Sequence, residues 1–140
     1  MIDKNQFSVC TSVYKNDNPE YVGTALDSML VNQTVKPTEI VLVQDGPVPS
    51  GLSVLLSEYE EKYPDVMHIF RFEKNGGLGN ALKIGVENAK YDIIARMDSD
   101  DICLPDRFEK QLAYLEMHPE CDIVGGQMTE FIDRPDNIVG

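Results

Sequence analysis

Hydrophobic residues in this chain fall into two patterns, short continuous runs and longer segments with helical spacing. Continuous apolar runs predict buried strands, while apolar residues three or four positions apart predict helices. The predicted strands span residues 7–13, 39–44, 66–72 and 91–97, and the helices that follow them span 19–30, 52–63, 78–89 and 105–118. Two further strands are predicted at 121–125 and 127–132.

Local signals support several of these helices. Asn18 resembles an N-cap, and Pro19 and Pro105 stand at expected first helical positions. The third helix carries an apolar stripe, which we expect to face the core: Leu78, Leu82, Val86 and Ala89.

Regular alternation of strands and helices with short connections predicts the α/β class. We expect a mostly parallel, Rossmann-like sheet with helices on both faces. The β-branched run from Ile40 to Val43 is typical of a parallel strand buried on both sides. At 140 residues with 42% hydrophobic content, the chain is most simply one domain.

Composition excludes several classes of protein. A net charge of −12 argues against binding to the nucleic-acid backbone, which needs a basic face. The sequence contains neither a transmembrane stretch nor a secretory signal pattern. Cys10, Cys103 and Cys121 share no close metal-type spacing, so we expect reduced thiols in a cytoplasmic protein.

An acidic segment, Asp98-Ser99-Asp100-Asp101, follows directly on the predicted strand 91–97. Clustered carboxylates repel one another unless a cation neutralises them, and carboxylate oxygens suit Mg²⁺, Mn²⁺ or Ca²⁺. A solvated turn or a helix N-cap is the alternative interpretation. An EF-hand is rejected, because Cys103 occupies the position that requires glycine.

Other polar segments should join the acidic segment, because the carboxyl ends of parallel strands share one edge of a sheet. Tyr14 could stack on a base, and Asp45 could accept a hydrogen bond from a base or ribose. The turn from Asn75 to Asn80, which includes Gly77, offers backbone N–H groups to an anion. Each segment alone is more often packing or a turn.

Binding of a dinucleotide such as NAD is a competing hypothesis. The segment Gly77-Leu78-Gly79-Asn80-Ala81-Leu82 partly matches the dinucleotide fingerprint, and Asp98 lies near the position of a ribose-binding acid. Leu82 replaces the third glycine, and NAD does not require three clustered carboxylates.

Together these segments resemble the family 2 glycosyltransferases, which have the GT-A fold. Residues 7–14 look like the opening strand ending in Tyr, and residues 39–46 look like the second strand ending in a base-binding Asp. Residues 75–81 are similar to the Asn-x-Gly-Leu turn, and residues 98–107 resemble the Asp-x-Asp motif with its following helix. Two departures are Lys15 and Leu82-Lys83, which leave Lys83 as a weak candidate for contacting diphosphate.

The resemblance implies an inverting transfer of a sugar from a nucleotide diphosphate donor to an acceptor hydroxyl, with Mn²⁺ or Mg²⁺ as cofactor. Asp100 would bind the metal, and Asp98 would contact metal, ribose or sugar. Asp101 would position the donor sugar. The residues expected to bind the donor nucleotide are Ser12, Tyr14, Asp45, Gly77 and Asp98.

We expect a nucleotide-sugar-binding domain over residues 7–132, with 133–140 as a tail or the start of an acceptor-side region. Relatives continue further, so the catalytic base is expected beyond residue 140. The expected partners are a UDP-sugar and a carbohydrate or lipid-linked acceptor, in the cytoplasm or at the inner face of the cell membrane. Self-association and a non-catalytic nucleotide- or sugar-binding module are further possibilities.

Overall fold

Strands and helices alternate along the part of the chain that the computed structural model describes, residues 6–118, 130–131 and 138–139. The elements are β1 Ser8–Val13, α1 Pro19–Leu30, β2 Glu39–Gln44, α2 Ser50–Lys62, β3 Met67–Arg71, α3 Leu78–Asn88, β4 Ile94–Arg96 and α4 Arg107–Met117. β5 Glu130–Phe131 pairs antiparallel with β6 Ile138–Val139 in a separate two-stranded sheet.

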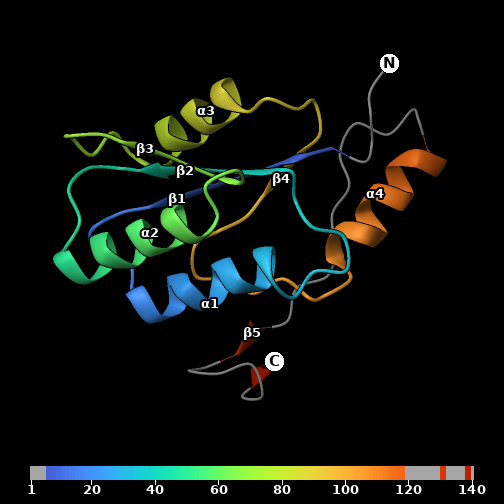
Figure 1. Ribbon diagram of the computed structural model, residues 1–140, viewed down its shortest axis with the longest axis horizontal. Helices are drawn as coiled ribbons and strands as arrows, with labels where there is room; N and C mark the ends of the chain where they lie inside the picture. Colours follow the sequence, from blue (N-terminus) through green and yellow to red (C-terminus); the bar gives the residue numbers. More distant parts are fainter. Residues whose placement is uncertain (1–5, 119–129, 132–137, 140) are drawn as a thin grey trace.

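The first four strands form one parallel sheet with the spatial order β3-β2-β1-β4. Figure 1 shows α3 on one face of this sheet and α1 and α2 on the other. The predicted α/β architecture with helices on both faces is therefore confirmed. The chain moves from β1 through β2 to β3 on one side and then returns to place β4 on the opposite side of β1.

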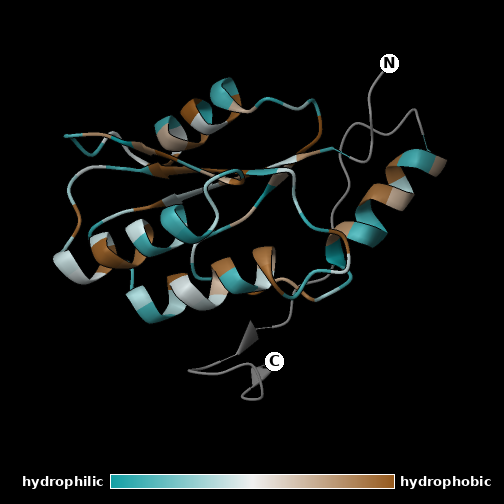
Figure 2. Cartoon of the chain, in the orientation of Figure 1, coloured by the Kyte–Doolittle hydropathy of each residue, from teal (hydrophilic) through white to brown (hydrophobic). Residues whose placement is uncertain are grey.

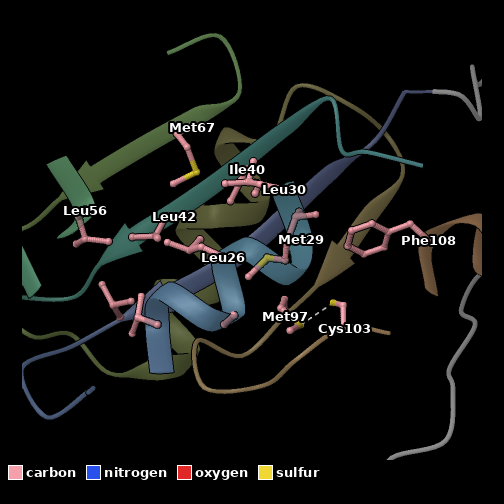
Figure 3. Close-up of a cluster of buried hydrophobic side chains, with 14 of the residues drawn as sticks. Leu26, Met29, Leu30, Ile40, Leu42, Leu56, Met67, Met97, Cys103 and Phe108 are labelled. Atoms are coloured by element: carbon pink, nitrogen blue, oxygen red, sulfur yellow. Dashed lines mark hydrogen bonds between the residues drawn. The ribbon is translucent and has the colours of Figure 1, made fainter. Parts of the chain in front are cut away.

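The core lies mainly between the sheet and the α1–α2 layer. All six residues of β2 are buried, as expected for a strand with neighbours on both sides. Figure 3 shows Leu26 and Met29 of α1 beside Leu42 of β2, with Phe108 of α4 at one end of the cluster. Hydrophobic residues concentrate along these strands and on the inner side of α1 (Figure 2).

Helix starts differ in how well the sequence predicted them. Asn18 is the N-cap of α1 and accepts a 2.9 Å hydrogen bond from the N–H of Glu20, with Pro19 in the first turn, as predicted. Pro105 does not begin α4, because the helix starts two residues later at Arg107. The carbonyl of Pro105 instead accepts a 2.8 Å hydrogen bond from the N–H of Thr34.

The predicted apolar stripe of α3 is wrong. Leu78 and Val86 are about half exposed (54% and 50%), while Ala81 and Gly85 form the buried face. The reason is close packing: a Cβ on Gly85 would lie 3.5 Å from the Cβ of Cys10 in β1. Small residues allow this approach, whereas a leucine stripe would hold the helix away from the sheet.

The strand before the acidic segment is shorter and more exposed than predicted. Only Ile94–Arg96 forms β4, and Ile94 is 36% exposed. β4 pairs only with β1 in the described sheet, so it has an edge position, which explains why it is less buried than its apolar content indicated. Met97, directly after it, is buried.

Two predictions concern the C-terminal part of the chain. The strand at 121–125 lies outside the described residues, and of the strand at 127–132 only Glu130–Phe131 is described, as β5. Among the described helices, none combines the length and the apolar character needed to cross a membrane.

Candidate active site

The carboxyl ends of β1, β2 and β4 meet at one edge of the sheet. The N–H of Asp45 donates to the carbonyl of Val13 at the end of β1, at 2.8 Å, and the N–H of Met97 donates to a β1 carbonyl at 3.0 Å. β2 and β3 are added on one side of β1 and β4 on the other, so the order of strand addition reverses between β1 and β4. Open α/β sheets bind ligands at such a switch point. Tyr14 follows β1 directly, and Asp98 follows β4 after Met97.

Asp45 connects the end of β2 to the glycine turn after β3. Its carboxylate accepts hydrogen bonds from the N–H groups of Gly76 (2.7 Å) and Gly77 (3.1 Å), and its carbonyl accepts one from the side chain of Asn75 (3.3 Å). Asp45 is only 7% exposed, so these donors replace the water that a buried carboxylate loses. The sequence predicted that Asp45 and the turn share an edge but not that they bind each other.

Gly77 has a backbone conformation that favours glycine, with φ of +90°. A Cβ added there would meet no atom within 4 Å, so the turn has open space beside it. Gly77 is also the N-cap of α3 and contributes no side-chain cap, which leaves the first N–H groups of that helix without a capping side chain. The N–H of Gly77 itself is engaged by Asp45, so an incoming anion would use the N–H groups of the first helical turn.

Asp17 links the loop after β1 to the acidic segment. Its Oδ2 accepts a 3.0 Å hydrogen bond from the N–H of Tyr14 and a 3.1 Å hydrogen bond from the hydroxyl of Ser99. Tyr14 is 41% exposed and is therefore accessible to a planar ligand. The structure thus brings Tyr14 and the acidic segment together through a residue that the sequence analysis did not select.

The acidic segment lies in a loop of residues 98–102, called the acidic loop below, and its three carboxylates have unequal environments. The pKa of Asp101 is raised above its usual value, first by desolvation, then by the negative charges of Asp100 and Asp98 and by a hydrogen bond with Asp98. Asp98 also forms an ion pair with Arg96 at 3.6 Å. The closeness of Asp98 and Asp101 means that a proton or a cation is needed to relieve their repulsion.

Whether these residues fit a divalent metal depends on their chemistry and their arrangement. In the described part of the chain, no three Asp, Glu, His or Cys side chains form a group that could hold a metal ion. The donor set nevertheless suits a hard cation, because it consists of carboxylates whose mutual repulsion a positive ion would relieve. Asp98 and Asp101 are the pair that already lie together, and Asp100 is exposed beside them.

Two other predicted contacts are less well placed. Ser12 is half-buried in β1 and points to the same face of the sheet as Cys10, two residues before it. Lys83, in the second turn of α3, forms a 3.9 Å ion pair with Glu87 on the same helix. The structure therefore gives no sign that Lys83 reaches the acidic loop.

Sequence reasoning missed Asp17 and included Asn75 only as part of the glycine turn. Asp17 follows Tyr14 by three residues, a spacing at which Asp side chains commonly bind the backbone of a preceding turn residue. Asn75 accepts a 3.0 Å hydrogen bond from the N–H of Gly77, which is an Asx-type turn. Both signals are local, but neither reveals the contacts with Ser99 and Asp45, which join segments distant in sequence.

Comparison with known sequences identifies the family. The sequence model described as "Glycosyl transferase family 2" matches residues 8–139. An uncharacterized glycosyltransferase of Haemophilus influenzae is 46% identical over 134 residues, which are 96% of this chain and 49% of the relative. The amylovoran biosynthesis glycosyltransferase AmsE of Erwinia amylovora is 46% identical over 125 residues, 89% of this chain and 46% of AmsE. The chain thus spans about half the length of these curated relatives.

Comparison with solved structures supports the same fold. Residues 1–349 of S. aureus TarS, in complex with UDP, superpose with a TM-score of 0.68 at 24% identity, covering 81% of this chain and 33% of TarS 1–349. The mannosyltransferase PcManGT of Pyrobaculum calidifontis, in complex with GDP-Man and Mn²⁺, has a TM-score of 0.59 at 20% identity, covering 69% and 28%. The chain therefore belongs to glycosyl transferase family 2 and has the GT-A fold.

Proposed function

We propose that this chain is the donor-binding half of a metal-dependent, inverting glycosyltransferase. It would take part in transferring a sugar from a nucleotide diphosphate donor to an acceptor hydroxyl. The observation that carries this proposal is the meeting of Tyr14, Asp45 and the acidic loop at the switch point of a GT-A sheet. Family membership argues against the NAD-binding alternative.

In the proposed site, the loops that follow β1 and β2 would hold the base and ribose, and the acidic loop would hold the metal and the donor sugar. Tyr14 would stack on the base, and Ser12 and Asp45 would bind the base or ribose. Asp45 would do so with the lone pairs of its carboxylate that the N–H groups of Gly76 and Gly77 do not occupy. Asp98 would contact ribose or metal. Asp100 is the proposed metal ligand, and Asp101 would orient the donor sugar.

A bound divalent cation would act as a Lewis acid toward the departing diphosphate. The carboxylates of Asp98 and Asp101 supply negative charge at the place where such a cation is needed. The N-terminus of α3, without a capping side chain, would offer further N–H groups to the diphosphate. Mn²⁺ and Mg²⁺ both suit these ligands, and the Mn²⁺ complex of PcManGT supports the first.

The identity of the donor and acceptor rests on the relatives. UDP in the TarS complex and UDP-Gal in the name of an Escherichia coli galactosyltransferase, which is 35% identical over 133 residues, support a UDP-sugar. The diphosphoundecaprenol in that name and the amylovoran of AmsE support a lipid-linked or carbohydrate acceptor in polysaccharide synthesis. Such acceptors would place the whole protein at the inner face of the cell membrane.

We assign no catalytic base within residues 7–132, which we propose as the donor-binding domain. The base must reach the acceptor hydroxyl, and we propose that it lies beyond residue 140. The greater length of the relatives supports this division. The isolated chain should therefore bind the donor nucleotide more readily than it turns the donor over.

The test is calorimetric titration of UDP into the chain with and without Mn²⁺, using wild type, Asp100→Ala and Asp92→Ala. Asp92 is exposed and lies before β4, at the other end of that strand from the acidic loop. We expect binding that requires Mn²⁺, is lost in Asp100→Ala and is retained in Asp92→Ala. If the folded wild-type chain binds neither UDP, GDP nor dTDP, the donor-site proposal is wrong, and binding of NAD without metal would favour the dinucleotide alternative.

A further inference from the structure

Arg107, in the first turn of α4, contacts both ends of the acidic loop. Its Nη1 lies 3.2 Å from the sulfur of Met97, which precedes the loop, and 3.2 Å from the sulfur of Cys103, which follows it. Its Nη2 donates a 3.0 Å hydrogen bond to the carbonyl of Arg96, the last residue of β4. One guanidinium group thus joins the end of a strand, both ends of a loop and a helix.

The two residues that Arg107 joins also touch each other. The sulfur atoms of Met97 and Cys103 are 3.3 Å apart, and both residues are almost fully buried. Figure 3 shows the two side chains pointing toward each other. This contact closes the base of the acidic loop. The loop's exposed carboxylates therefore project from a short segment whose two ends are held at a fixed separation.

The far end of the loop is also bound to α1 and to the residues that follow it. The N–H of Cys103 donates to the hydroxyl of Ser28 at 3.0 Å. The buried side chain of Gln33 donates to the carbonyl of Leu104 at 2.7 Å and accepts from the N–H of Phe108 at 3.2 Å. Since α1 packs in the core, these bonds fix the position of the start of α4, where Arg107 lies.

We propose that Arg107 is a positioning residue that holds the acidic loop in the conformation needed to bind metal and diphosphate. The role in ligand binding rests on the proposed function, whereas the role in ordering the loop does not. Arginine suits this position, because Nη1 of its planar fork reaches two sulfur atoms while Nη2 reaches a carbonyl. A lysine ammonium keeps the charge but cannot span the three acceptors.

The chain offers a matched control for the loss of charge. Lys110 lies one turn further along α4, carries the same charge and pairs with Asp106 at 2.9 Å, with its side chain exposed. Gln111 is a second control, because it accepts a 3.2 Å hydrogen bond from Nε of Arg107 and lies away from the loop contacts. Arg107→Met and Arg107→Lys can therefore be compared with Lys110→Met and Gln111→Ala.

The first measurement is amide hydrogen exchange of residues 98–103, made on the full chain. We expect faster exchange in this segment in Arg107→Met, partial recovery in Arg107→Lys, and wild-type exchange in both controls. Exchange in β1 and β2 should stay unchanged in all variants. A general increase across these strands would show that Arg107 supports the whole fold. No increase in the loop would show that Arg107 does not position it.

The second measurement is calorimetric titration of UDP in the presence of Mn²⁺. We expect Kd to rise about tenfold in Arg107→Met, about the effect of losing one hydrogen bond to a charged group, and to stay unchanged in the controls. Equal affinities in Arg107→Met and Lys110→Met would overturn the proposed role in binding. If wild type binds no nucleotide, the proposed function fails, and amide exchange alone decides whether Arg107 orders the loop.

Discussion

Oδ1 of Asp45 accepts a 2.7 Å hydrogen bond from the N–H of Gly76, which lies 31 residues further along the chain. This bond joins the end of β2 to the turn that begins α3. Asp45 therefore has two tasks in the proposed site, because the same carboxylate that would bind the nucleotide also holds the glycine turn. The two tasks can be separated by measuring stability and binding in the same variants.

Asp45→Asn should weaken both properties. An amide has one oxygen and presents its NH₂ group to the N–H of Gly76 or Gly77, so one of these donors loses its bond to residue 45, although Gly77 keeps the side-chain oxygen of Asn75. We expect a loss of about 1–3 kcal/mol in the free energy of unfolding, measured by urea denaturation. UDP affinity should fall as well. Asp92→Asn is the control, and equal stability of the two variants would contradict the assigned role of Asp45.

Three glycine-to-alanine substitutions should rank according to backbone conformation and space. Gly77→Ala should cost about 1–2 kcal/mol, because φ is +90° although the space beside it is open. Gly46→Ala should cost more, because its φ is also +90° and its Cβ would lie 2.9 Å from the backbone nitrogen of Asn75. Gly51→Ala, in α2, should stabilise the chain by about 0.5 kcal/mol.

These three variants can be compared by thermal or urea unfolding. The ranking tests local geometry directly, since each change adds only one methyl group. If Gly46→Ala destabilises the chain no more than Gly77→Ala does, then the backbone at Asn75 can move away from residue 46. The contact between Gly46 and Asn75 would then be looser than the structure indicates.

Burial and, to a lesser extent, the charge of Glu39 raise the pKa of Cys10 from 9.0 to about 11. The folded state therefore retains this proton more strongly than the unfolded state does. The resulting stabilisation is fully present below pH 9 and is lost as pH rises from about 9 to about 11. We expect the difference in unfolding free energy between wild type and Cys10→Ala to shrink over that range and to be constant between pH 6 and 8.

Alkylation gives a second measurement of the same property. Cys10 should react with iodoacetamide far more slowly at pH 8 in the native chain than in urea, because the native thiol is both protonated and buried. Cys103 is buried as well, so the sites must be distinguished by mass spectrometry. Equal native and denatured rates at Cys10 would contradict its position under α3.

Glu39, at the start of β2, is a buried carboxylate that accepts hydrogen bonds from two donors. It accepts hydrogen bonds from the hydroxyl of Ser8 (2.6 Å) and the N–H of Lys90 (2.5 Å), and His68 lies 4.0 Å away. Glu39→Ala would leave these donors without their partner, so we expect it to cost about 3 kcal/mol or more. Ser8→Ala should cost less, since Lys90 keeps its acceptor and only the N–H of Tyr91, in a long 3.4 Å bond, loses one.

A double-mutant cycle of Glu39→Ala and Ser8→Ala measures whether this group acts as a unit. We expect the double variant to be less destabilised than the sum of the single variants, because Ser8 loses the hydrogen bond that it donates to Glu39 once Glu39 is gone and keeps only the one that it accepts from the N–H of Tyr91. Additive effects, measured by urea unfolding, would show that the hydroxyl contributes independently of the carboxylate.

The sequence by itself determined the order of the elements and the fold class. Apolar runs such as Ile40–Val43 and caps such as Asn18-Pro19 are local signals, and the structure confirms them. The placement of Tyr14, Asp45 and the acidic loop at one edge also followed from sequence, because the carboxyl ends of parallel strands must share an edge.

Only the tertiary structure decided which residues touch across that edge. The bonds of Asp45 with Gly76 and of Asp17 with Ser99 join segments 31 and 82 residues apart, so no local pattern reveals them. The same holds for α3, where packing against Cys10 selects Gly85 for the buried face in place of the more apolar Val86. Hydrophobicity determines which residues can be buried, whereas the distance between packed backbones determines which of them are buried.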